Sequence, residues 1–165
     1  MTIQEGKDYL RQNWRDGTTC PCCTQVVKLY PVKLNSSMVR VLGEMERLSK
    51  FERYVHCIEE LKTVNGDYAK LRHWGLVVPM PKDKAPEGKK ATGYWKPTDL
   101  ARQFMFEGLK LPEKVFIFNN TQYRVHDPEL RMITFKQAMN NTFDYNDLMR
   151  NFMSYSERSQ TNLFQ

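Results

Sequence analysis

Hydrophobic and polar positions along this chain alternate in short periodic blocks. One of these blocks predicts a long amphipathic helix. Apolar side chains recur at helical intervals after a capping Asn35 or Ser36, at Met38, Val41, Leu42, Met45 and Leu48. This spacing places them along one face of a helix. An earlier block, residues 3–14, begins with Thr2 and Glu5 at the spacing of a capping box and predicts a shorter helix.

Between residues 57 and 97 the pattern changes from two further short helices to a hairpin. Ile58 and Leu61 lie three residues apart in the first helix, and the second begins near Asp67 and ends near Gly75. Two stretches typical of strands follow, LVVPMP and GYWKP, separated by the polar loop KDKAPEGKKAT. We therefore expect a β-hairpin with a long polar tip.

Shorter patterns fill the remaining sequence. QVVKLYPVKL predicts one extended segment interrupted at Pro31. Residues 114–118 and 121–125 flank an Asn-Asn pair that tolerates the positive φ of a tight turn, so a second hairpin is expected there. Helices are also predicted after the capping residues Thr98 and Thr134, and the last one begins at about Asp144, before a polar tail.

The order of these elements predicts the fold class. Three helices, a two-stranded hairpin and another helix follow one another in residues 35–110, as in a winged helix-turn-helix. We therefore predict an α+β fold in three parts. Residues 1–34 form a short N-terminal element that contains cysteines, residues 35–110 form the winged-helix core, and residues 111–165 form the C-terminal hairpin, helices and flexible tail.

Composition excludes two classes of chain. Hydrophobic residues make up 41% of the 165 positions and aromatic residues 12%, too many for a disordered chain. The mean hydropathy of -0.64 and the lack of a long apolar run exclude a membrane span. The first residues, MTIQEGKDYL, show no basic segment followed by an apolar stretch. We therefore expect a soluble protein that is not secreted and functions in a reducing cell interior.

The balance of charge favours a polyanionic partner. Lys and Arg number 25 against 19 Asp and Glu, which gives a net charge of +6. In a winged helix, one helix enters the major groove while cations on the hairpin reach phosphates. The candidate nucleic-acid contacts are therefore Lys70, Arg72 and His73 on the second helix and Lys82, Lys84, Lys89 and Lys90 at the hairpin tip. The alternative is that these lysines form an ordinary solvated surface.

Three of the four cysteines lie within the four residues CPCC. The C-x2-C spacing lets Cys20 and Cys23 bind one structural zinc ion, and His56 and Cys57 are the candidates for its other two ligands. His73 and His126 are poorer candidates, and Cys22 could instead take one of the places. Thr24 stands where zinc knuckles commonly have glycine, and no second C-x2-C pair is present. Two other interpretations stay open, namely reduced thiols that only pack in the interior and a reactive thiol.

Several stretches carry a resemblance to a known group of proteins. They are TCPCC, VKLYPVKLNSSMVR, YVHC, GDYAKLRHWGLV, GYWKPTDLARQFMFEG and FDYNDLM, and the resemblance covers about residues 8 to 150. Together they are similar to a family of small, mostly uncharacterised bacteriophage proteins with an N-terminal cysteine element and a winged helix. The resemblance implies a location in the cytoplasm of a bacterial host. It brings no catalytic residues.

These observations lead to two competing hypotheses of function. The first is a phage-encoded winged-helix protein that binds duplex DNA as a regulator or accessory factor. The second is a non-enzymatic protein that binds a host complex, such as a defence system, and blocks it. The chain has no phosphate-binding glycine loop, serine-nucleophile elbow or paired metal-binding histidine motif, so we do not expect an enzyme. Amphipathic patterns at both ends are compatible with a homodimer.

Overall fold

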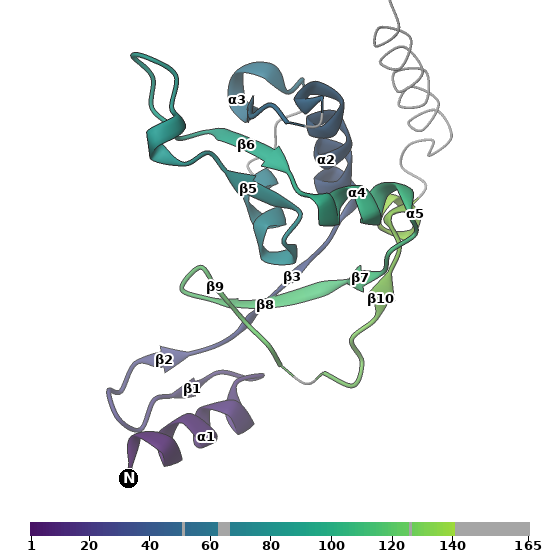
Figure 1. The fold of residues 1–165 in the computed structure, drawn as a ribbon. Coiled ribbons are helices and arrows are strands. Elements are labelled where there is room, and N and C mark those ends of the chain that lie inside the picture. Colours follow the sequence, from purple (N-terminus) through teal and green to yellow (C-terminus); the bar gives the residue numbers. More distant parts are fainter. Residues whose placement is uncertain (51, 63–66, 126, 141–165) are drawn as a thin grey trace, which may run out of the picture. The chain divides into compact units, whose positions relative to one another are not determined.

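The computed structural model describes residues 1–50, 52–62, 67–125 and 127–140, and its fold is mixed α+β with small antiparallel sheets (Figure 1). The chain forms two compact units, each built from separate parts of the sequence. The first unit contains Met1–Lys33 and Lys114–Arg131, and the second contains Leu34–Glu113 together with the chain after Arg131. Within the described ranges, no helix has the length and apolar character needed to cross a membrane.

The first unit combines one helix with two small sheets. Helix α1 (Ile3–Asn13) is followed by a pair of two-residue strands, β1 (Thr18–Thr19) and β2 (Val26–Val27). A second antiparallel sheet has the order β3–β8–β9, with β3 at Tyr30–Lys33, β8 at Lys114–Phe118 and β9 at Thr121–Tyr123. Strands β3 and β8 lie far apart in the sequence, so their pairing closes this unit.

Local chemistry explains most of the first unit. The Thr2 hydroxyl accepts the backbone N–H of Glu5 while the Glu5 carboxylate accepts that of Thr2, which completes the predicted capping box of α1. Trp14 is buried and meets Phe116 edge to face, with 4.9 Å between ring centroids. Pro31 lies inside β3 opposite Phe116 rather than interrupting the strand. A proline is tolerated there because β3 is at the edge of its sheet.

The second unit contains most of the helices and its own core. Its elements are α2 (Ser36–Ser49), β4 (Val55–His56), α3 (Cys57–Glu60), the 3₁₀ helices η1 (Tyr68–Trp74) and η2 (Lys82–Lys84), β5 (Val77–Pro79), β6 (Tyr94–Pro97), α4 (Asp99–Phe106), β7 (Leu111–Pro112), β10 (Met132–Ile133) and α5 (Phe135–Met139). Strands β4, β6 and β5 form one antiparallel sheet in that order, and β7 pairs with β10. Helix α2 packs against both β6 and α5.

The predicted apolar face of α2 forms the centre of this core. Met38, Val41, Leu42 and Met45 are almost completely buried, and Asn35 caps the helix by accepting the N–H of Met38. The rings of Phe104 in α4 and Phe135 in α5 meet edge to face at 5.6 Å. All three tryptophans are buried, as expected for residues that pack in the interior.

Most predicted elements are present, and several differ in detail, including the extended segment around Pro31, which forms the two strands β2 and β3. The helix after Asp67 has 3₁₀ rather than α geometry, and the second strand of the later hairpin ends at Tyr123 instead of residue 125. Asn119 and Asn120 have positive φ angles of 47° and 62°, so the predicted tight turn is confirmed. The helix predicted from about Asp144 and the polar tail lie outside the described residues.

Candidate nucleic-acid interface

The connection between β5 and β6 extends beyond the strands of the sheet β4–β6–β5 (Figure 1). Val77 pairs with Pro97 and Pro79 pairs with Trp95, so the two strands are in antiparallel register at the base. The connection between them contains η2, whose three residues are all exposed. The predicted hairpin with a polar tip is therefore confirmed.

Helix η1 leads directly into this hairpin. Its apolar side is fixed because Leu71 and Trp74 are buried and the Trp74 indole donates to the backbone carbonyl of Pro112 at 2.7 Å. Gly75 then ends the helix with a φ of 73°, a conformation that favours glycine. The opposite side of η1 is consequently left to solvent.

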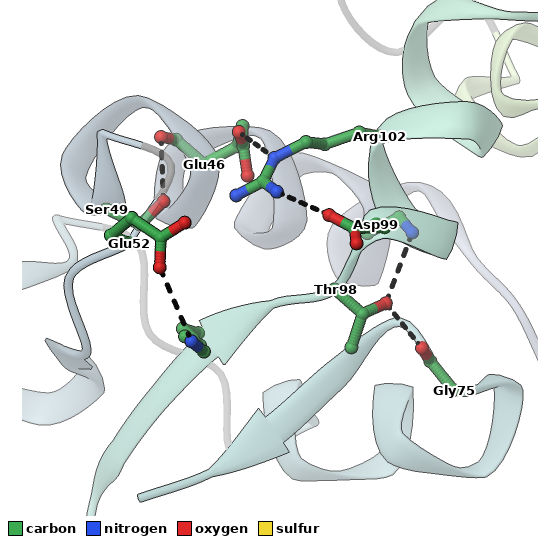
Figure 2. Close-up of polar contacts among 9 residues, drawn as sticks. Glu46, Ser49, Glu52, Gly75, Thr98, Asp99 and Arg102 are labelled. Carbon is green, nitrogen blue, oxygen red and sulfur yellow. Dashed lines mark hydrogen bonds and ion pairs between the residues drawn. The ribbon is translucent and has the colours of Figure 1, made fainter.

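A network of polar contacts ties η1, α4 and α2 together (Figure 2). The Thr98 hydroxyl donates to the carbonyl of Gly75 at 2.6 Å and accepts the N–H of Ala101 at 3.3 Å, so one side chain both caps α4 and holds the end of η1. Arg102 of α4 donates to the Glu46 carboxylate of α2 at 2.9 Å and to Asp99 at 2.8 Å. These contacts fix the helix that precedes the hairpin and the one that follows it.

The base of the hairpin depends on a close contact between Gly93 and His56. Gly93 has a φ of 90°, and a β-carbon there would lie 2.9 Å from His56 Nε2. The His56 ring also meets Tyr94 edge to face at 4.6 Å, and its Nδ1 accepts the backbone N–H of Glu59 at 3.2 Å. Our sequence reasoning missed this supporting role of His56. The glycine directly before YWKP was the only signal for it.

The three basic residues predicted on η1 have different surroundings. Lys70 is exposed but forms an ion pair with Asp67 at 2.7 Å, which offsets part of its charge. Arg72 is exposed. His73 is half-buried, and burial together with the neighbouring Arg72 lowers the pKa of its imidazole, so it is uncharged at neutral pH. Arg72 is therefore the cation of this helix best placed for a phosphate or a base edge.

The four lysines predicted at the hairpin tip lie together in sequence and are all exposed: Lys82, Lys84, Lys89 and Lys90. Within the described part of the chain, none of them is within ion-pair distance of an acid. The acids of the same loop, Asp83 and Glu87, are exposed as well. The tip thus keeps a net positive charge. Lys96, by contrast, is at the base, 3.9 Å from Glu52 and 5.0 Å above the ring of Tyr54.

The residues predicted to bind zinc are divided between the two units, Cys20 and Cys23 in the first and His56 and Cys57 in the second. Cys57 is fully buried, and desolvation together with nearby Glu60 raises the pKa of its thiol to about 12, which disfavours the thiolate that zinc requires. No group of three or more metal-binding side chains occurs among the residues that the structure describes. The zinc site stays a prediction.

The CPCC segment nevertheless forms a well-defined turn between β1 and β2. The backbone N–H of Thr24 donates to the carbonyl of Cys20 at 2.9 Å, and that of Cys20 donates to the carbonyl of Gln25 at 2.8 Å. Thr24 adopts a φ of 60°, the left-handed conformation for which glycine was expected. The backbone amides of Cys22 and Cys23 donate to the sulfur of Cys20, and this lowers the pKa of the Cys20 thiol.

Comparison of the chain with known protein families, with curated proteins and with solved structures gave no match. The resemblance to bacteriophage proteins stays a prediction from the sequence stretches that carry it. Any function must therefore be argued from the geometry and charge of the two units.

Proposed function

We propose that the second unit is a winged-helix module that binds duplex DNA. The observation that carries the proposal is the strand order β4–β6–β5, in which η1 leads into β5 and the β5–β6 connection carries exposed lysines. A winged helix has the same connectivity, in which a helix and a strand are followed by two helices and a hairpin. The second strand of the hairpin, here β6, pairs with the strand that precedes the two helices, here β4. In this proposal η1 is the recognition helix and residues 80–93 are the wing.

The charges of this surface support a partner that presents phosphates. The wing lysines keep their charge exposed, and Arg72 extends the positive surface onto η1. Lysine contacts to phosphates release counterions, so they supply affinity for any duplex and make it depend strongly on salt. Arginine can also donate two hydrogen bonds to guanine in the major groove. Arg72 is therefore the residue proposed to read sequence, and the wing lysines are proposed to hold the duplex.

The context of this activity follows from the resemblance of the sequence. In a phage-infected bacterium, a small non-enzymatic protein that binds duplex DNA would act as a regulator or an accessory factor. We include this role in the proposal. Attachment to a host protein complex is the rival function, and it predicts no affinity for DNA.

Fluorescence anisotropy with a random duplex, titrated at several salt concentrations, tests the proposal. The variant Lys89→Glu with Lys90→Glu should weaken binding to every duplex alike. It should also reduce the slope of log K against log salt by about 2, because each phosphate contact contributes about 0.9 to that slope. Arg72→Ala should instead change the preference among duplexes.

The matched control is Arg40→Glu with Arg47→Glu, which makes the same change in charge on the exposed face of α2. It should bind DNA with nearly the parent salt dependence. Equal weakening by both double variants would show that only net charge matters and that the wing is not the contact surface. Absence of binding at low salt would leave attachment to a host protein as the better explanation.

A further inference from the structure

The cysteine turn of the first unit offers a chemistry that DNA binding does not use. Cys20 is buried, whereas Cys22 and Cys23 are exposed, and none of the three is joined in a disulfide. One buried thiol and two exposed thiols thus share a single turn.

The backbone of this turn is compatible with a disulfide between Cys20 and Cys23. The bond from Thr24 N–H to the Cys20 carbonyl closes the turn, and β1 and β2 hold its two ends in antiparallel register. Residues three apart in such a turn have Cα atoms within about 7 Å, and disulfides form at Cα separations of about 4.4–6.8 Å. Cys20 and Cys23 can therefore be joined with little movement of the backbone.

Helix α1 explains why Cys23 rather than Cys22 is the partner of Cys20. The sulfur of Cys22 lies against Gly6, where an added β-carbon would be only 2.8 Å away. A glycine inside a helix costs about 1 kcal/mol relative to alanine, and this close approach accounts for its presence. The sulfur of Cys22 thus lies against α1, whereas Cys23 is exposed and three residues from Cys20 in the turn.

We propose that Cys20 and Cys23 form a thiol pair that exchanges with disulfides of other molecules and closes to an intramolecular disulfide. In the first step the exposed thiolate of Cys23 attacks a small disulfide such as oxidised glutathione, forms a mixed disulfide and releases one thiolate. In the second step the Cys20 thiolate attacks the Cys23 sulfur, forms the Cys20–Cys23 bond and releases the other thiolate. The protein loses two electrons and two protons, and the small disulfide is reduced to two thiols.

The test is incubation of the full chain with oxidised glutathione, followed by alkylation and mass spectrometry. The variant Cys22→Ser should lose two hydrogens, carry no glutathione and give a peptide that links Cys20 to Cys23. In the variant Cys20→Ser with Cys22→Ser the second step is impossible, so Cys23 should keep a lasting glutathione adduct. Near-ultraviolet circular dichroism, which reports the packing of the buried aromatic side chains, checks the fold of each variant. Peptide mapping of the parent chain answers the same question without a substitution.

Two results would overturn the proposal. One is a lasting glutathione adduct on Cys23 while Cys20 stays reduced, which would show that the two sulfurs cannot join. The other is one equivalent of zinc in the purified protein together with failure of the thiols to exchange until a chelator removes the metal. That result would assign the turn to the predicted zinc site. Neither depends on whether the second unit binds DNA.

Discussion

Gly93 shows how a single residue limits the position of the proposed wing. Its φ of 90° and the nearby ring of His56 are two separate constraints, one on the backbone and one on available space. Gly88 in the same loop has a similar φ of 72° but no atom within 4 Å of an added β-carbon. The two glycines therefore allow backbone strain to be separated from crowding at the base of the hairpin.

We expect Gly93→Ala to destabilise the protein by more than Gly88→Ala does. Both variants acquire the strain of a positive φ, which costs about 1–2 kcal/mol, and only Gly93→Ala must also displace His56. The midpoint of urea unfolding, measured for each variant beside the parent, gives the difference. Equal losses of stability in the two variants would mean that crowding against His56 does not contribute to the destabilisation.

Single residues also show which features could be predicted from the sequence and which could not. Capping side chains such as Thr98 and Thr134 act on backbone groups three residues away, so they were read correctly from spacing alone. The lowered pKa of His73 and the raised pKa of the Cys57 thiol depend first on burial, which the packing of the fold determines. Their charge states followed from packing, for which the sequence carries no local signal.

At the scale of elements, helices α2 and α4 are joined by the contact of Glu46 with Arg102. The Glu46 side chain is only 3% exposed and that of Arg102 is 21% exposed, so the pair is shielded from solvent. Asp99, which also accepts from Arg102, is 91% exposed. Removing Arg102 would leave the Glu46 carboxylate buried without this cation, whereas removing the charge of Asp99 alters a solvated group.

Arg102→Met should therefore cost about 3 kcal/mol of the free energy of unfolding, in the range for a broken buried ion pair. Asp99→Asn should cost less than about 1 kcal/mol. The double variant Glu46→Leu with Arg102→Met should recover most of the loss, because apolar residues can replace a buried ion pair. Chemical denaturation of the three variants measures these differences, and a double variant no more stable than Arg102→Met would contradict the explanation.

Elements were predicted well where their signal is local, and pairings between distant strands were not. The stripe on α2 and the asparagine turn after β8 depend on residues close in sequence. Nothing in YPVK indicates that it pairs with KVFIF more than eighty positions later, because apolar side chains on a strand fit many partners. The sequence consequently predicted three consecutive parts, whereas the chain forms two interleaved units.

At the scale of the whole molecule, the points at which the chain enters and leaves the second unit lie close together. The Leu34 N–H donates to the Glu113 carbonyl at 2.8 Å, and Pro112 of β7 is paired with Met132 of β10. The chain thus leaves the second unit before residue 114 and re-enters it after residue 131, at adjacent points. Two residues suffice to connect antiparallel neighbours in a hairpin.

A chain that begins at residue 34 and replaces 114–131 by Asn-Gly should therefore fold and show the same salt-dependent affinity for duplex DNA that we propose for the full chain. The sheet β4–β6–β5 and the core of α2 remain complete in it. Deleting only residues 1–33 should instead remove the partner of β8, uncover Val115 and Phe116, and expose that segment to proteases. Anisotropy and limited proteolysis compare the two, and loss of folding in the first chain would show that the units are not separable.

The adjacent entry and exit points on β7 and β10 also bear on how such a gene can change. A recombination event at this place, together with loss of the leading codons, would delete the cysteine-bearing unit while sparing the second unit, which we propose to bind DNA. The reverse event would graft a new sensor or adaptor onto an existing binder. The adjacency of these points would therefore let the first unit be lost or replaced while the second keeps its sheet and core.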